Sequence, residues 1–250
     1  MFTLVGWSEA QAYGATYAAI AALPDPHVRV EGVNVIVPAD LPYIGGLYGV
    51  GANLTAVRVD SPSLRRVSPV DISYIDAAAE PSSPGTFEDR FTSPIPVVSY
   101  EPLRALTSNN ASSGTTRVSV LTWLTDGPQV PVSGDIYTVM ATSSTTLTAY
   151  AWTNGALTFS QVLPAGRYQV VGMVAQSAGL IAARLLFVGG KWRPGCLCRD
   201  SVSDVSPSVF RFGRLGVWGE FNHDAPPTVD FLSSSADSSE IVWLDLIKVG

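Results

Sequence analysis

The feature that most constrains this fold is a match of the chain to itself at an offset of 126 residues. With Val37-Pro38-Ala39 laid over Leu163-Pro164-Ala165, seven of the 21 positions from Pro38 to Arg58 are identical to their partners. Average composition would give roughly two such identities. Each half also closes on an alternating strand, Arg117–Leu124 in the first and Glu240–Ile247 in the second. The match predicts two copies of one structural unit.

Most of the chain after Pro26 is typical of short strands. Apolar and polar residues alternate with period two in four segments: Val28–Val35, Arg117–Trp123, Thr146–Tyr150 and Glu240–Leu246. Such alternation is typical of strands with one buried face, and the Gly, Pro, Ser, Asn and Asp clusters between them indicate turns. Many short strands separated in this way predict an all-β sandwich or barrel.

Helical signal is confined to the N-terminus. Ser8 and Gln11 fit a capping box, and an alanine-rich stretch then runs to Leu23 before Pro24 ends it. The Gly/Pro-rich segment Asp126–Pro131 divides the chain near its middle. We therefore expect an N-terminal arm with a short helix (residues 1–26), a first sandwich (27–127) and a second sandwich (128–250).

Composition and charge argue against a membrane-spanning segment and against nucleic-acid binding. Only 14% of the residues are charged, which favours extensive subunit contacts over a free polar surface. The longest apolar stretches, such as Leu180–Val188, are too short to span a bilayer. A net charge of −6 with only two lysines, Lys191 and Lys248, argues against direct nucleic-acid binding, and the one dense basic spot is Arg65-Arg66. Met1–Val5 lacks the basic start and apolar core of a signal peptide.

No catalytic or metal-binding constellation stands out, so we predict no enzyme, no catalytic residues, no metal and no cofactor. The two histidines, His27 and His223, fall in turn-like segments without a nucleophile or ligand set beside them. Cys196 and Cys198 would share one face of a strand, but no second pair accompanies them, and reduced thiols are the preferred interpretation.

The matched arginines of the two halves, Arg58 and Arg184, lie in apolar strands. The preferred interpretation is an ion-paired or snorkelling arginine at a sandwich edge. The alternative is a contact between subunits that both halves use.

The chain resembles the double jelly-roll major capsid proteins of tailless icosahedral viruses and phages. The resemblance rests on the Pro-Ala turns at Pro38-Ala39 and Pro164-Ala165, the paired Ala-x-Leu-x-Ala-x-Arg strands and the break at Gly127-Pro128. It implies two tandem jelly-roll β-sandwiches that arose by internal duplication. It also implies a trimer with six sandwiches around its axis, which forms a pseudo-hexameric capsomer of a virus shell.

The resemblance further implies a set of partners and a location. The expected partners are the homotrimer, neighbouring capsomers, minor capsid or penton proteins and an internal membrane, with no direct sequence-specific nucleic-acid binding. The expected location is the virion, after synthesis in the host cytoplasm without a signal peptide.

Two alternatives remain open from the residues. The first is a viral spike or receptor-binding module that binds glycans through aromatic residues; the candidates are Trp152, Trp192, Trp218 and Trp243. The second is a hydrolase on a sandwich scaffold that uses the carboxylates of Glu220 and Asp224.

Overall fold

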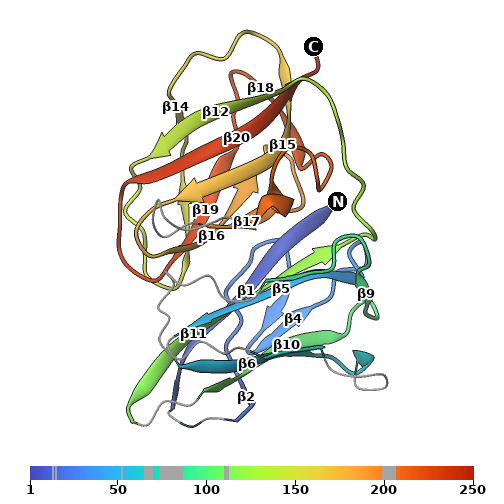
Figure 1. Cartoon of the computed structure of the whole chain (residues 1–250), viewed down its shortest axis with the longest axis vertical. Coiled ribbons are helices and arrows are strands. Elements are labelled where there is room, and N and C mark those ends of the chain that lie inside the picture. Colours follow the sequence, from blue (N-terminus) through green and yellow to red (C-terminus); the bar gives the residue numbers. More distant parts are fainter. Residues whose placement is uncertain are drawn as a thin grey trace. The chain divides into compact units, whose positions relative to one another are not determined.

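The computed structural model describes residues 1–12, 14, 16–51, 53–64, 70–73, 87–109, 113–198 and 207–250. Within these residues the regular elements are strands and one 3₁₀ turn, η2 (Ser208–Phe210), which confirms the all-β prediction. The chain forms two compact units (Figure 1). The N-terminal unit is Leu4–Pro128, and the C-terminal unit combines Gln129–Gly250 with Met1–Thr3.

The N-terminal unit has two sheets. In the first the strand order is β1 (Phe2–Ala12), β11 (Thr115–Thr125), β5 (Tyr43–Gly51) and β8 (Glu88–Asp89), and β9 (Ile95–Pro96) also pairs with β5. In the second the order is β3 (Val30–Glu31), β4 (Asn34–Ile36), β10 (Pro102–Asn109), β6 (Leu54–Asp60) and β7 (Val70–Ser73), and β2 (Ala18–Ala19) pairs with β10.

The C-terminal unit also has two sheets. In the first the order is β14 (Thr158–Phe159), β12 (Ile136–Ser143), β20 (Glu240–Lys248), β15 (Arg167–Gln176) and β18 (Gly219–Asn222). In the second it is β13 (Trp152–Gly155), β19 (Thr228–Ser233), β16 (Leu180–Leu186) and β17 (Gly195–Leu197). In each unit the two sheets pack as layers with the apolar core between them (Figure 1).

The two units repeat the same local irregularities. The β5–β11 ladder skips Gly45 and the β15–β20 ladder skips Val171. On the opposite sheets, the β6–β10 ladder skips Thr55 and the β16–β19 ladder skips Ile181. Each skipped residue in the N-terminal unit lies 126 positions before its counterpart, which is the offset found in the sequence.

The predicted N-terminal helix is wrong. Phe2–Ala12 is a strand, and Ser8 and Gln11, the expected capping residues, are buried in it. The Ser8 hydroxyl donates to the carbonyl oxygen of Val118, and the Gln11 amide donates to that of Ala18. Pairing with distant strands overrides the helix propensity of the alanines, because β1 gains a full ladder and a buried face that an isolated short helix lacks.

Candidate interaction surface

The outward face of the β14-β12-β20-β15-β18 sheet is the main candidate surface of the C-terminal unit. Side chains on this face follow from strand alternation and register: Ile136, Thr138, Met140 and Thr142 from β12; Ile241, Trp243, Asp245 and Ile247 from β20; and Gln169, Val174 and Gln176 from β15. We call this set the outer face.

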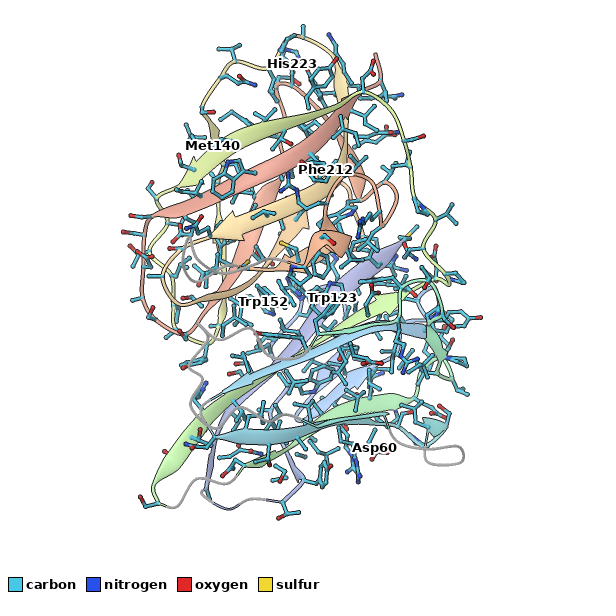
Figure 2. All side chains as sticks on the ribbon, in the orientation of Figure 1. Asp60, Trp123, Met140, Trp152, Phe212 and His223 are labelled. Atoms are coloured by element: carbon cyan, nitrogen blue, oxygen red, sulfur yellow. The ribbon has the colours of Figure 1, made fainter. Side chains whose placement is uncertain are left out.

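The middle of the outer face is an apolar row that is partly exposed. Met140 is opposite Trp243, which is opposite Val174, so these three side chains form one row across three strands. Met140 is 38% exposed and Trp243 is half-buried, and Phe212 beside this sheet is 57% exposed (Figure 2). The corresponding strand of the N-terminal unit differs, since Val118–Thr125 of β11 is buried on both faces.

One charged cluster lies within the outer face. Asp245 is fully buried and accepts hydrogen bonds from Arg211 Nε at 2.6 Å, from the backbone N–H of Phe212 at 3.0 Å and from the Thr138 hydroxyl at 2.7 Å. Burial alone would raise the pKa of Asp245, but the hydrogen bonds from Arg211, Phe212 and Thr138 outweigh it and lower that pKa. The charge of Asp245 is therefore neutralised within the chain.

Gly172 explains how this cluster forms. A Cβ at Gly172 would lie 2.6 Å from Asp245 Oδ2 and 2.9 Å from the carbonyl oxygen of Phe210. At the matching position of the N-terminal unit, a Cβ on Gly46 would meet the Phe87 ring at 3.1 Å. In both units a residue that precedes an edge strand lies against this glycine: Phe87 before β8 and Phe210 before β18. Close packing therefore explains why Gly46 and Gly172 are identical.

A second cluster is buried in the other sheet of the C-terminal unit. Asp230 accepts hydrogen bonds from Arg184 Nε at 3.0 Å, from Arg193 Nη1 at 2.7 Å and from the Asn154 amide at 3.0 Å. Arg184 is 1% exposed, and its Cζ lies 4.1 Å from the ring centroid of Trp152. Two guanidinium groups thus share one carboxylate in a site with little access to water.

The first residues of the chain pack against this region of the C-terminal unit. The Phe2 ring contacts Trp218 edge-on at 5.2 Å, and the Thr3 hydroxyl accepts a hydrogen bond from the backbone N–H of Arg193 at 3.2 Å. The amino terminus of Met1 donates to Gln129. Phe2 and Thr3 are therefore buried in the C-terminal unit, whereas the sequence predicted a separate arm.

The matched arginines have related but unequal surroundings. Arg58 is half-buried, and its Cζ lies 4.0 Å from the ring centroid of Tyr17. Arg184 stacks on Trp152 in the same way but is buried and ion-paired. Arg184 is therefore not the edge residue that we expected, and the aromatic partner is the feature that the two positions share. Arg65 and Arg66 lie outside the described residues.

The residues considered for catalysis are exposed. Glu220 lies 3.5 Å from Arg167 and accepts a hydrogen bond from Gln169, and Asp224 is exposed in the turn that follows β18. The backbone N–H of Gly166 donates to His223 Nδ1 at 3.4 Å. His27 is exposed in the loop before β3.

The four candidate tryptophans do not form one exposed surface. Trp192 and Trp218 are each 7% exposed, Trp152 stacks on Arg184, and Trp243 belongs to the outer face. This arrangement offers little support for the predicted glycan-stacking surface.

The two cysteines are free thiols. Cys196 is buried in β17, opposite Ala183. Burial first, and then the neighbouring Cys196, raise the pKa of Cys198 well above its usual value. Across the described residues, no group of three or more His, Cys, Asp or Glu side chains could hold a metal ion.

The fold and surface define an all-β chain of two sandwich units, in which no described helix is long and apolar enough to cross a membrane. No protein-family model matches the chain, and no curated protein matches its sequence. Among solved structures, the chain is similar to the major capsid protein P2 of bacteriophage PM2. The similarity has 12% identity and a TM-score of 0.26, and it covers 100% of this chain and 98% of that chain. A likeness this distant carries no functional argument by itself.

Proposed function

We propose that each unit is a jelly roll and that the chain arose by tandem duplication. The eight main strands of the N-terminal unit are, in chain order, β1, β4, β5, β6, β7, β8, β10 and β11. If these strands are numbered one to eight, the two sheets have the strand orders 1-8-3-6 and 2-7-4-5. The C-terminal unit has the same order, with β12, β13, β15, β16, β17, β18, β19 and β20 as strands one to eight. The shared double-sheet order of eight strands supports the assignment of each unit as a jelly roll.

Details of register support the duplication. The skipped residues of the ladders lie 126 positions apart, as described above, and so do two residues with positive φ in the central hairpin turns, Asn53 (φ 60°) and Gly179 (φ 72°). Bulges and left-handed turn residues depend on local backbone geometry and not on overall composition. Two unrelated sandwiches would have no reason to share them at one offset.

The function that these features support best is that of a structural subunit of an icosahedral virus shell. The observation that carries the proposal is the same strand order in two tandem units of one short chain. Covalent linkage of two sandwiches lowers the entropy cost of placing six of them around one axis, so that a trimer forms a pseudo-hexameric capsomer. Jelly rolls also serve in lectins and cupins, but a cupin needs clustered metal ligands, and none is found among the described residues.

The outer face is our candidate for a contact between copies of the chain. Its row of Met140, Trp243 and Val174 is apolar, and its one carboxylate, Asp245, already has Arg211 as its partner. The cores of protein interfaces are similarly depleted in uncompensated charge. We further propose neighbouring capsomers, minor capsid or penton proteins and an internal membrane as partners, with the virion as the location and no enzymatic role.

The test is electron microscopy of the purified protein together with light scattering for its mass. We expect trimers that grow into hexagonal sheets or closed shells. A stable monomer would refute the proposal, and a trimer that never grows would favour the spike alternative.

Two matched variants test the outer face. Met140→Glu places a charge on the row, whereas Val162→Glu places one on a loop residue that is 95% exposed and lies outside the sheet. We expect Met140→Glu to stop growth beyond small particles and Val162→Glu to assemble normally, with unchanged far-UV circular dichroism in both. Equal effects of the two variants would exclude the outer face as the contact.

A further inference from the structure

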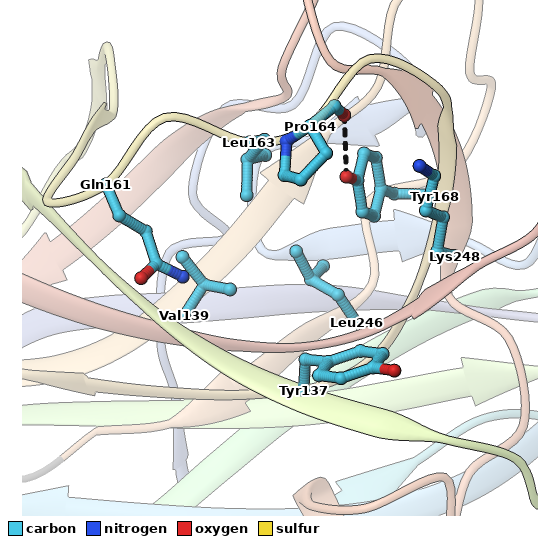
Figure 3. A pocket seen from close by; sticks show the side chains of 8 residues that line it. All are labelled: Tyr137, Val139, Gln161, Leu163, Pro164, Tyr168, Leu246 and Lys248. Carbon is cyan, nitrogen blue, oxygen red and sulfur yellow. Dashed lines mark hydrogen bonds between the residues drawn. The ribbon is translucent and has the colours of Figure 1, made fainter.

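A pocket of about 330 Å³ opens into the interior of the C-terminal unit (Figure 3). It lies between the inward face of the β12-β20-β15 sheet and the loop that precedes β15. Its lining residues are Tyr137, Val139, Gln161, Leu163, Pro164, Tyr168, Leu246 and Lys248. Its volume is in the range of small-molecule sites, which starts at roughly 300 Å³.

The pocket is apolar at its base. Val139 is 3% exposed and Leu246 is fully buried, and both point from the sheet toward the loop. Leu163 covers them from the loop and is 7% exposed. A ligand group that lies against Val139, Leu163 and Leu246 must be hydrocarbon, because a polar group there would lose its hydration without gaining a partner from these side chains.

The loop over the pocket is held in place. The Tyr168 hydroxyl donates a hydrogen bond to the carbonyl oxygen of Pro164 at 2.7 Å (Figure 3). Tyr168 itself is buried, and its ring stacks on Phe221 at 5.6 Å. The pocket is thus formed by packed residues and does not depend on a ligand for its shape.

The charge at the rim of the pocket indicates which head group the ligand carries. Of the eight lining residues, all within the described part of the chain, Lys248 alone is charged, and it is exposed. The salt bridges found within the described residues do not include Lys248. The Lys248 ammonium is therefore available to an anion at the mouth of an apolar pocket.

We propose that this pocket binds a free single-chain amphiphile with an anionic head, of the fatty-acid class. The hydrocarbon chain lies against Val139, Leu163 and Leu246, and the carboxylate lies at the rim beside Lys248. The exposed Tyr137, which is opposite Leu246 in the ladder, flanks the entrance. The site is independent of shell assembly, so it can be tested on unassembled protein.

Isothermal titration calorimetry with hexanoate, octanoate and decanoate, below their micelle concentrations, tests the apolar part. Affinity should rise about 4-fold for each added methylene that is buried, and then level off once the pocket is full. Leu163→Trp should fill the space and abolish decanoate binding. Unchanged binding by a folded Leu163→Trp protein would overturn the proposal.

The two lysines of the chain provide a matched pair for the head group. Lys248→Gln should weaken decanoate binding about 2- to 5-fold, as for an exposed ion pair, and should leave decanol binding unchanged. Lys191→Gln removes the same charge from an exposed residue that stacks on Trp192 and does not line the pocket, and it should have no effect. Equal losses from both variants would indicate non-specific attraction and overturn the assignment.

Vesicles of phosphatidylglycerol and phosphatidylcholine test whether the pocket binds a free amphiphile or the acyl chain of a membrane lipid. We expect the protein to remain in the supernatant when the vesicles are pelleted. If the parent protein pelleted with the vesicles and Leu163→Trp did not, the proposal of a free ligand would be overturned and the pocket would be assigned to membrane lipid.

Discussion

Replacement of Asp230 by asparagine should destabilise the C-terminal unit severely. Asp230 is 4% exposed, and its carboxylate accepts hydrogen bonds from two arginines, Arg184 and Arg193, that are themselves 1% and 8% exposed. Asparagine has nearly the same shape but no charge, so both buried guanidinium groups would lose their ion pair with this carboxylate. Removal of one partner from a buried ion pair costs about 3–5 kcal/mol, and the loss of two ion pairs at once places the expected cost at the upper end.

Urea unfolding followed by tryptophan fluorescence measures this loss. Four of the six tryptophans, at positions 152, 192, 218 and 243, belong to the C-terminal unit, so the signal reports mainly on its unfolding. With a slope of about 2 kcal/mol per molar urea, the midpoint should fall by roughly 2 M. The control Asp224→Asn changes an exposed carboxylate and should stay within about 0.5 kcal/mol of the parent. A loss below about 1 kcal/mol for Asp230→Asn would refute the reasoning that the buried arginines depend on this carboxylate.

Three further predictions concern packing and protonation. Gly172→Ala should cost about 1–3 kcal/mol in urea unfolding, because its Cβ would lie 2.6 Å from Asp245 Oδ2, whereas Gly250→Ala, with open space around it, should be neutral. Burial, and then the charge of Asp237, raise the pKa of the Glu240 carboxyl. Ionised Glu240 therefore lowers the free energy of unfolding above that pKa, and this destabilisation disappears as the pH falls through the pKa. Glu240→Gln should therefore raise the free energy of unfolding at pH 8 by on the order of 1 kcal/mol and change it little at pH 4, and a larger gain at pH 4 would contradict this sign. Since burial raises the pKa of Cys198, thiol reagents at pH 7.5 should modify the native protein at least about 10-fold more slowly than the urea-unfolded chain, and equal rates would show that the thiols are accessible.

The wrong N-terminal helix shows where local sequence signals fail. Ser8 and Gln11 have the spacing of a capping box, and the alanines that follow favour a helix in isolation. Their actual partners, Val118 and Ala18, lie on other strands, and Val118 is 110 residues from Ser8. Spacing within a short window carries no information about a strand that far away.

The environment of Arg184 illustrates the same limit. Its match to Arg58 could be found by sequence comparison, and both positions prove to lie beside an aromatic ring. The carboxylate of Asp230, 46 residues further on, and the Arg193 guanidinium that shares this carboxylate could not be assigned to it from the pattern. An apolar strand with one arginine is compatible with an edge, an interface or a buried ion pair, and only the neighbouring strands decide among these.

The sequence by itself determined the all-β class, the position of many strands and the offset of 126 residues that relates Leu54–Asp60 to Leu180–Leu186. These features follow from period-two alternation and turn residues, which act over a few neighbouring positions. The tertiary structure alone decided that the first residues form a strand, that Asp230 gathers two buried arginines and that a pocket remains beneath Leu163. These features depend on which distant strands become neighbours, because burial and ion pairing are set by packing between segments and not by the order of residues within one.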